Sequence, residues 1–231
     1  MRLAVLFSGG KDSTFSVYLA QKAGHSIECL ISLSSENPHS FLFHTPNIQW
    51  TPLLAEAMGI SLAVVPTLGR KETELQDLKK ALMDLKKTRA IEGVVTGAIA
   101  STYQASRIQR VCFELGLPCF NPLWKVRPEI YWKDLLQSSF DVRMSAVAAQ
   151  GLNETWLGRK LDARAVQELK ALHERNGLSI IGEGGEFETL VLNGPPFKKR
   201  VHILEEKKEW NGVNGTYKVL RAALRAKRRH A

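Results

Sequence analysis

Five apolar residues near the start of the chain lead directly into two glycines and a helix-forming segment, and this order most constrains the fold. Residues 3–7 predict a buried strand, and residues 8–13 read Ser-Gly-Gly-Lys-Asp-Ser. Glycines allow a tight turn whose N–H groups point at an anion, and the helix that begins near Asp12 adds the positive end of its dipole. The order predicts a cradle for the phosphates of a nucleoside triphosphate. The predicted contacts are Ser8, Gly9, Gly10, Lys11, Asp12 and Ser13.

The segment is not a Walker-type phosphate loop, because its residues do not follow the order G-x-x-x-x-G-K-[ST]. Its residue types still suit phosphate, since Lys11 supplies a mobile cation and the hydroxyls of Ser8 and Ser13 supply further donors. The alternative is a glycine-rich turn between strand and helix that binds nothing.

The first half of the chain alternates strand-like and helix-like segments. Strands are predicted at residues 3–7, 27–33, 62–65, 93–96 and 118–123, and helices at 15–22, 50–58, 72–87 and 103–115. This alternation is typical of an α/β fold with a parallel sheet covered on both faces, which binds ligands at the carboxyl ends of its strands.

The second half predicts a smaller α+β domain with antiparallel strands. Strands are expected at 140–148 and 187–192, a helix at 163–176, and a hairpin from 201–209 and 217–224 around two Asn-Gly turn signals. Asn-Pro and Arg-Pro pairs mark the boundary. We therefore expect an ATP-binding domain at 1–124 and a substrate domain at 125–231.

Basic residues gather at the C-terminal end. Residues 198–231 hold eleven lysines and arginines against three glutamates, within a whole chain of net charge +9. Such a segment can meet RNA, an acidic protein or an acidic membrane face, although many charged runs are only solvated surface. We expect it to dock a macromolecular substrate and to take no part in chemistry. The main contributors would be Arg221, Arg225, Lys227, Arg228 and Arg229.

The three cysteines, Cys29, Cys112 and Cys119, lie in or beside apolar stretches without C-x-x-C spacing. Buried thiols are therefore expected, with neither a zinc site nor disulfides. No apolar run approaches the roughly 18 residues of a membrane span. Arg2 leads directly into the first strand and leaves no room for a signal peptide, so a cytoplasmic protein is expected.

Beyond the loop at residues 8–13, a second glycine-rich and polar segment follows the strand at 93–96. Here Gly97 leaves the strand, Ser101 precedes a helix, and Arg107 lies farther along that helix. The segment can bring backbone amides and a helix start toward a bound nucleotide. On the plainer interpretation, Gly97 only ends a strand and Ser101 only caps a helix.

Two further segments are candidates for the substrate side of the site. Glu183, Glu186 and Glu188 lie among glycines, and carboxylates this close repel one another unless they are solvated or share a cation. They form either an exposed loop or a site for Mg²⁺, ammonium or a cationic substrate, and strand spacing would put Glu186 and Glu188 on one face. His44, beside two phenylalanines, is either a base or substrate contact or a structural histidine.

Together these segments resemble the diphthine–ammonia ligase family within the PP-loop ATPases, the N-type ATP pyrophosphatases. The similar motifs are SFLFHTPN, GAIAS-x-YQ, PLW, GL-x-x-x-WLGR and EGGEFETLVL, at residues 40–47, 97–104, 122–124, 151–159 and 183–192. Simple PP-loop proteins share only SGGKDS, so the combination is specific, and it extends to about Arg200. The resemblance implies an adenine nucleotide α hydrolase-like fold for the first domain.

The resemblance also implies a reaction: ATP-dependent amidation of diphthine, a modified histidine of translation elongation factor 2, with release of AMP and pyrophosphate. A carboxylate is a competent nucleophile at neutral pH, so it can attack the α phosphate and form an acyl-adenylate that then meets ammonia. ATP and Mg²⁺ are the implied cofactors. Free ammonium is the expected nitrogen donor, because no cysteine is placed for a glutaminase and the chain has no room for a separate glutaminase domain.

Residue roles follow from matching these motifs. The implied catalytic residues are Lys11, Ser101, Glu186 and Glu188. Gly97 and Arg107 join the nucleotide contacts, and Asp12 is the metal candidate, although it would serve equally well as a helix cap. The implied substrate contacts are His44, Tyr103, Gln104, Trp124 and Glu183. Glu186 and Glu188 would receive ammonium or the trimethylammonium of diphthine, and Trp124 would add a cation–π contact.

Two other functions remain open. A tRNA-modifying adenylating PP-loop enzyme would suit the basic C-terminal end, although the missing C-x-x-C pair counts against its thiolating branch. A nucleotide-sensing module would bind ATP without turnover. The expected partners are elongation factor 2 in its diphthine form, ammonium and a second copy of the chain, with no membrane and with RNA less favoured.

Overall fold

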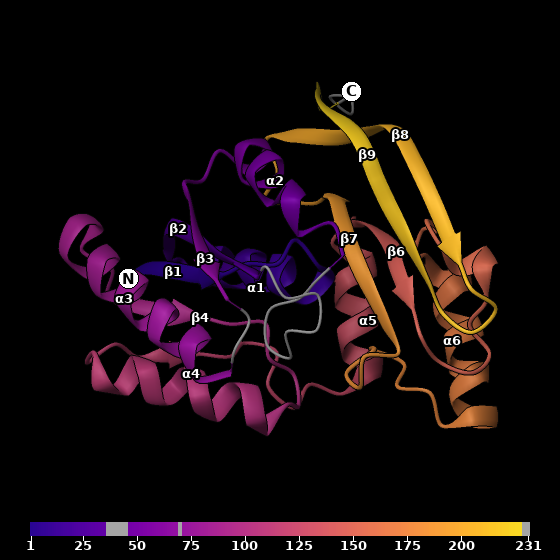
Figure 1. The fold of residues 1–231 in the computed structure, drawn as a ribbon, viewed down its shortest axis with the longest axis horizontal. Coiled ribbons are helices and arrows are strands. Elements are labelled where there is room, and N and C mark those ends of the chain that lie inside the picture. Colours follow the sequence, from indigo (N-terminus) through magenta and orange to yellow (C-terminus); the bar gives the residue numbers. More distant parts are fainter. Residues whose placement is uncertain (36–45, 69–70, 228–231) are drawn as a thin grey trace. The chain divides into compact units, whose positions relative to one another are not determined.

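The computed structural model describes residues 1–35, 46–68 and 71–227, and the chain divides into two compact units, Met1–Lys125 and Val126–Ala231. Each unit contains its own β-sheet (Figure 1). None of the helices that the structure describes combines the length and the apolar character needed to cross a membrane.

The first unit is built on a parallel sheet of five strands in the order β3-β2-β1-β4-β5. The strands are β1 (Arg2–Leu6), β2 (Ser26–Ser35), β3 (Leu62–Thr67), β4 (Gly93–Val95) and β5 (Cys119–Phe120). The helices are α1 (Lys11–Lys22), α2 (Thr51–Met58), α3 (Lys71–Arg89) and α4 (Thr102–Glu114), with a 3-10 turn η1 at Ile48–Trp50. The predicted α/β fold with a parallel sheet is confirmed.

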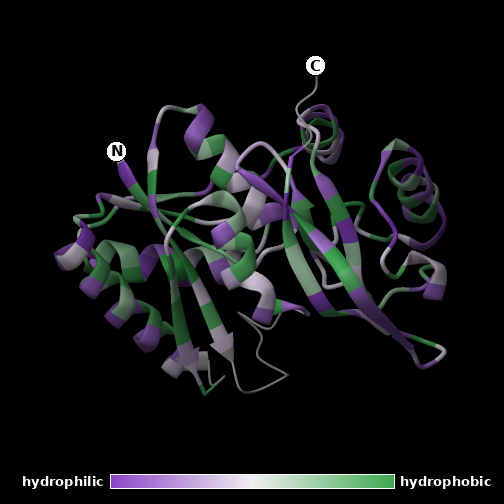
Figure 2. Cartoon of the chain, turned by 90° about the horizontal axis from the view of Figure 1, so that it is seen from above, coloured by the Kyte–Doolittle hydropathy of each residue, from purple (hydrophilic) through white to green (hydrophobic). Residues whose placement is uncertain are grey.

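Strand alternation divides the apolar residues of this unit between two faces of the sheet. Ala4 and Leu6 of β1 belong to a buried cluster with residues of α3 and α4, whereas Leu3 lies on the side of α1. Leu78 and Leu82, one helical turn apart, give α3 its buried side, and in Figure 2 the helices carry hydrophobic and hydrophilic residues on different sides. Both faces of the sheet are therefore covered.

The strand order of this unit reverses direction next to β1, and such a switch point is where open α/β sheets bind ligands. The chain passes from β1 to β2 and β3 on one side and returns to β4 on the other, so β1 and β4 are neighbours whose following helices diverge. In open α/β sheets ligands bind at the carboxyl ends of two such strands. The segments that follow β1 and β4 are the two glycine-rich segments singled out in the sequence.

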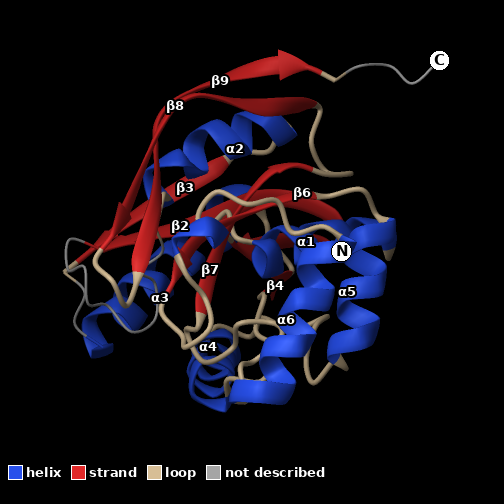
Figure 3. Cartoon of the chain, turned by 90° about the vertical axis from the view of Figure 1, so that its right-hand side faces the viewer, coloured by secondary structure: helices blue, strands red, loops and turns tan. Residues whose placement is uncertain are grey.

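The second unit is α+β, with an antiparallel sheet in the order β7-β6-β9-β8 (Figure 3). Its strands are β6 (Asp141–Val147), β7 (Phe187–Asn193), β8 (Lys199–Trp210) and β9 (Gly215–Ala226). Its helices are α5 (Pro128–Gln137) and α6 (Ala163–Asn176), with a 3-10 turn η2 at Glu154–Trp156. This confirms the expected smaller α+β domain and its C-terminal hairpin.

Strands β8 and β9 form a long two-stranded ribbon, which is joined to the rest of the sheet at one end only. β9 pairs with β6 through Gly215 and Thr216, whereas β8 and β9 pair along almost their whole length. The neighbouring edge of β6 is occupied by residues 158–161, because the N–H of Met144 donates to Arg159 O at 3.0 Å and the N–H of Leu161 donates to Val142 O at 2.9 Å. The far end of the ribbon is therefore paired only within itself.

Two elements differ from the sequence-based expectations. Helix α5 was not predicted; it begins at Pro128, which suits a first helical turn, and it buries Tyr131 and Trp132. The strand expected at 118–123 contains only Cys119–Phe120, because the chain then turns at Asn121, whose carbonyl accepts the N–H of Trp124 at 3.0 Å. All three cysteines are free thiols; Cys29 and Cys112 are buried, as expected, whereas Cys119 is half-buried.

Candidate nucleotide site

The segment from Ser8 to Ser13 forms a compact turn between β1 and α1. Gly9 has a φ of 80°, which a residue with a side chain rarely adopts. The hydroxyl of Ser13 lies 3.2 Å from the hydroxyl of Ser8 and donates to Gly10 O at 3.2 Å, while the N–H of Ser8 donates to Ser13 Oγ at 3.2 Å. The hydroxyls of the two serines thus stabilise the turn that Gly9 and Gly10 allow.

A buried cation lies where α1 begins. Lys11 is 3% exposed, and its Nζ lies 2.8 Å from Asp12 Oδ2, whose side chain is 31% exposed. The N-cap residue of α1, Gly10, makes no side-chain cap hydrogen bond, and the positive end of the helix dipole lies at this turn. The turn, the lysine and the helix N-terminus therefore combine the three features that bind phosphate.

Gly97 brings the segment after β4 against this turn. A Cβ at Gly97 would lie 2.8 Å from Ser13 N and 2.9 Å from Asp12 C, both backbone atoms that cannot move aside. The hydroxyl of Ser16 also donates to Thr96 O at 3.2 Å. The structure therefore brings together the two segments that the sequence assigned to one nucleotide.

The remaining predicted residues of this segment lie at the start of α4. Ser101 caps the helix, because its Oγ accepts the N–H of Gln104 at 3.3 Å. The guanidinium of Arg107 lies 3.9 Å from the ring centroid of Tyr103, which is 37% exposed. Ser101 thus acts as a helix cap, the simpler of the two roles considered for it. Arg107 packs against an aromatic ring near the first turn of the same helix.

Two hydrogen bonds join the segment after β4 to the segment after β5, and a third lies within the segment after β4. Thr96 Oγ1 donates to Asn121 Oδ1, and the N–H of Ala98 donates to Thr96 Oγ1 at 3.2 Å. The N–H of Lys125 donates to Ile99 O at 2.7 Å. Trp124, a predicted substrate contact, is half-buried in this turn. Sequence reasoning missed Thr96 and Asn121, although their place at the carboxyl ends of adjacent strands was a usable signal.

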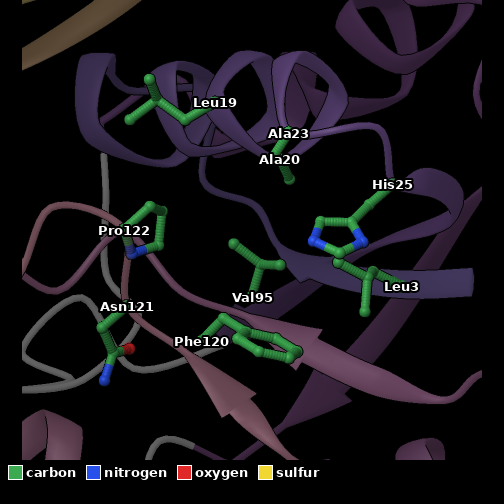
Figure 4. A pocket seen from close by; sticks show the side chains of 9 residues that line it. All are labelled: Leu3, Leu19, Ala20, Ala23, His25, Val95, Phe120, Asn121 and Pro122. Atoms are coloured by element: carbon green, nitrogen blue, oxygen red, sulfur yellow. The ribbon is translucent and has the colours of Figure 1, made fainter. Parts of the chain in front are cut away.

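A cavity of about 280 Å³ in the first unit is separate from these phosphate contacts. Figure 4 shows Leu19 and Ala20 of α1 above Val95 and Phe120 of the sheet, with His25 at one end and Asn121 at the other. The lining is mostly apolar, and none of the predicted site residues contributes to it. We therefore do not assign the nucleotide to this cavity.

The glutamate-rich segment of the second unit is a tight loop before β7. Glu186 lies just before the strand, and its carboxylate accepts the N–H of Gly184 at 2.7 Å and that of Ser179 at 3.2 Å. A Cβ at Gly184 would lie 2.9 Å from that carboxylate, so glycine makes room for it. Glu188 is half-buried within β7, and Glu183 is exposed. Glu186 is thus already bound by its own loop.

The Trp-Leu-Gly-Arg motif at residues 156–159 has a packing role in the second unit. Trp156 is buried, and Gly158 has a φ of 75°, with the Tyr217 ring 2.7 Å from where a Cβ would lie. Arg159 forms two hydrogen bonds with Glu168 of α6, at 2.6 and 2.7 Å. This pairing lowers the pKa of the Glu168 carboxyl to about 2.

The predicted roles of His44 and of Mg²⁺ are not part of the geometry described above. His44 lies outside the described residues. Among the residues that the structure does describe, no group of three histidine, cysteine, aspartate or glutamate side chains could hold a metal ion. Asp12 alone still fits Mg²⁺ that arrives with ATP, because such an ion is usually bound by one or two carboxylates together with the phosphates of the substrate.

Comparison with known families covers both units. Residues 1–119 match the family model of the diphthamide synthase N-terminal domain, and residues 127–224 match that of the diphthamide synthase C-terminal domain.

Named relatives agree with the family models. A diphthine–ammonia ligase of Danio rerio is 35% identical over 224 residues, covering 88% of this chain and 86% of that protein. One from Homo sapiens is 33% identical over 222 residues, with 88% and 83% covered. One from Schizosaccharomyces pombe is 34% identical over 222 residues, but the match covers 89% of this chain and only 36% of that longer protein.

One solved structure is similar at a lower level. It is described as a predicted subunit of tRNA methyltransferase from Methanocaldococcus jannaschii, and it aligns with a TM-score of 0.44 and 19% identity over 84% of this chain and 97% of that chain. A similarity this low does not bear on function.

Proposed function

The chain belongs to the diphthine–ammonia ligase family, and from this premise we propose that it is an ATP-dependent ligase of diphthamide biosynthesis. Its substrate would be the diphthine of translation elongation factor 2, and ammonium would supply the nitrogen. The observation that supports the proposal is the packing of Gly97 against the backbone of Asp12 and Ser13, because it brings two family motifs together at the proposed anion site. The tRNA-modifying alternative is not favoured, since the relatives described above are all named diphthine–ammonia ligase.

The proposed chemistry begins at the phosphates of ATP. The substrate carboxylate attacks the α phosphate, the bond between the α and β phosphates breaks, and pyrophosphate leaves. Lys11 and the amides of the turn would stabilise the negative charge that develops on pyrophosphate. Mg²⁺, held by Asp12 and the phosphates, would neutralise part of the same charge. The turn and the lysine are in place before the nucleotide binds, so little reorganisation is needed.

Ammonia then resolves the acyl-adenylate. Ammonium first gives one proton to water; the lone pair of the resulting ammonia attacks the acyl carbon, AMP leaves with one oxygen of the original carboxylate, and the nitrogen releases a second proton to water as the amide forms. We propose that Glu186 and Glu188 attract the cationic groups, ammonium and the trimethylammonium of diphthine. Glu186 is half-buried and carries two backbone hydrogen bonds, so it would act as a fixed negative charge. Ser101, Tyr103, Gln104, Arg107 and Trp124 are retained as proposed nucleotide or substrate contacts.

The test follows atoms through one turnover. The chain is incubated with ATP, ¹⁵N-ammonium and elongation factor 2 in its diphthine form, and AMP, pyrophosphate and the modified peptide are quantified. We expect equal amounts of AMP and ¹⁵N-amide, and oxygen-18 placed in the diphthine carboxylate should appear in AMP. Release of ADP, or AMP formation with bulk tRNA instead of the elongation factor, would contradict the proposal.

A further inference from the structure

Charge is unevenly distributed along the ribbon of β8 and β9. Near the turn, acidic and basic residues are paired: Glu209 lies 3.1 Å from Lys207 Nζ and 2.5 Å from Lys218 Nζ, and Tyr217 donates to Glu206. These lysines lower the pKa of the Glu209 carboxyl, Lys218 having the larger effect. At the end of the ribbon next to the turn, which we call the balanced end, acidic and basic side chains therefore neutralise one another.

The opposite end of the ribbon holds only positive charge. Residues 195–204 and 222–227 contain no aspartate or glutamate. Arg200 and Arg225 lie directly across from each other in the ladder, both are exposed, and within the described part of the chain neither forms an ion pair. We call this surface the cationic end; its residues are Lys198, Lys199, Arg200, Arg225 and Lys227.

Two arginines in directly opposed positions are an unfavourable arrangement. Directly opposed like charges destabilise a sheet, because the two side chains lie close together on the same face. The same ribbon pairs Glu205 with Arg221 in its ladder a few residues away, so a neutral arrangement is available to this fold. The strand end is also held in place, because Lys227 Nζ donates to Gly194 O at 2.8 Å. An anionic partner would turn this repulsion into attraction.

We propose that the cationic end is a docking surface for an acidic surface of the protein that carries the diphthine, an inference that rests on the proposed function. Guanidinium groups bind carboxylates through two parallel hydrogen bonds, and Arg200 and Arg225 are placed to do so side by side. β8 is moreover the outermost strand of its sheet, so an extended acidic segment can add to its edge.

A protein partner suits this surface better than single-stranded RNA. Proteins that bind single strands combine cationic grooves with exposed aromatic rings on which bases stack. Residues 199–204 and 222–227 contain no phenylalanine, tyrosine or tryptophan, and the neighbouring Phe197 is only 3% exposed. The cationic end therefore offers charge and an open strand edge without a stacking platform.

The test removes the two arginines and measures amidation kinetics together with binding. In Arg200→Ala/Arg225→Ala the KM for the diphthine protein should rise roughly 5- to 10-fold at low salt, with kcat and the KM for ATP unchanged. Direct binding of the elongation factor should weaken by the same factor, and both effects should fade at high salt. Because the change removes a repulsion, thermal stability should stay equal or rise, which a merely structural role would not predict.

Two control variants define the source of any effect. Lys207→Ala/Lys218→Ala removes the same charge from the balanced end of the ribbon and should change KM less than about 2-fold. Arg200→Lys/Arg225→Lys keeps the charge but loses the two parallel hydrogen bonds of each guanidinium, so its KM should lie between those of the wild type and the alanine variant. An equal effect of the Lys207/Lys218 variant would overturn the proposal, since net charge alone would then be responsible.

The remaining outcomes separate this inference from the proposed function. If the arginine variant binds the elongation factor as the wild type does, docking at the cationic end is wrong even though the enzyme amidates. If it loses binding to a duplex or single-stranded RNA but keeps the protein KM, the surface serves RNA and the proposal is overturned. If the wild type binds the factor through these arginines but forms no AMP, docking stands and the ligase function fails.

Discussion

Lys11 is the residue on which the proposed chemistry most depends. It is 3% exposed and its Nζ is held 2.8 Å from Asp12, so its charge is in place beside the turn before any phosphate arrives. Lys11→Ala should reduce AMP formation on the order of 10²-fold or more, because a positioned cation stabilises the pyrophosphate leaving group. Single-turnover AMP release, with far-ultraviolet circular dichroism as a check on folding, measures this.

The matched control is Lys22→Ala, which removes an exposed lysine from the last turn of the same helix. It should leave turnover within about 2-fold of the wild type, because its charge is far along the helix from the turn. Near-normal AMP production by Lys11→Ala would refute the role of the turn in binding ATP.

Gly97 makes a different kind of contribution, through the space it leaves empty. In Gly97→Ala the new Cβ would meet the backbone of Ser13 at 2.8 Å, so one of the two segments must shift. We expect stability to fall by about 1–3 kcal/mol, the usual cost of overpacking, and ATP affinity to fall on the order of 10-fold. Calorimetric titration with a non-hydrolysable ATP analogue measures the affinity.

Ala100→Ser tests whether any change in this segment has the same effect. Ala100 lies three residues after Gly97 and is exposed, so the added hydroxyl has access to solvent. ATP affinity close to the wild-type value is expected. If Gly97→Ala also bound ATP normally, the close approach of the two segments would have no role in the site.

At the scale of elements, the Arg159–Glu168 pair connects α6 to the segment that occupies the edge of β6. The pair lowers the pKa of the Glu168 carboxyl to about 2. A folded pKa below the unfolded value means that this contribution is complete above about pH 4.5 and is lost as pH falls toward 2. Unfolding in urea at a series of pH values should show wild type and Glu168→Gln differing most at neutral pH and converging in acid.

The control is Glu174→Gln, which replaces an exposed glutamate of the same helix. The difference between its free energy of unfolding and that of the wild type should stay constant over that pH range. A constant difference between wild type and Glu168→Gln down to pH 2 would show that the pair does not titrate as its geometry indicates.

Elements with strong local signals were predictable from the sequence. The alternating strands and helices of the first unit and the Asn-Gly hairpin of the second are set by periodicity and turn residues, which act over a few neighbours. Helix α5 was missed because its buried face, Tyr131 and Trp132, is recognised only through packing such as the bond from Trp132 Nε1 to Ile180 O at 3.1 Å. Residues 158–161 pair with the part of β6 that β9 does not reach, and this pairing likewise depends on contacts between segments that are distant in the sequence.

The sequence predicted which residues belong to the candidate site better than it predicted the contacts that those residues make. The sequence identified Ser8–Ser13 and Gly97 as one site, because parallel strands end at a common edge. It did not reveal that Glu186 folds back onto the amides of Gly184 and Ser179, since the expected strand spacing begins only at Phe187. A loop carboxylate takes whichever donors the turn presents, and that is decided by backbone geometry rather than by residue type.

At the scale of the whole molecule, all the proposed phosphate contacts belong to the first unit. A fragment of residues 1–125 should therefore fold and bind ATP with a Kd within several-fold of that of the full chain, while forming no AMP with the diphthine protein. Calorimetry and the amidation assay measure the two properties. A fragment that folds but does not bind ATP would show that the second unit contributes to the nucleotide site.

The strand order has a consequence for how the protein is made. β1 leaves the ribosome before the other strands of its sheet, yet it becomes the centre of that sheet, with β2 and β3 added on one flank and β4 and β5 later on the other. Roughly 90 more residues must be synthesised after this turn before Gly97 is available to pack against it. At common elongation rates their synthesis takes about 5 to 20 s. Throughout that interval the nascent chain carries half of the proposed anion site, so we expect it to hold nucleotide only after β4 has joined the sheet.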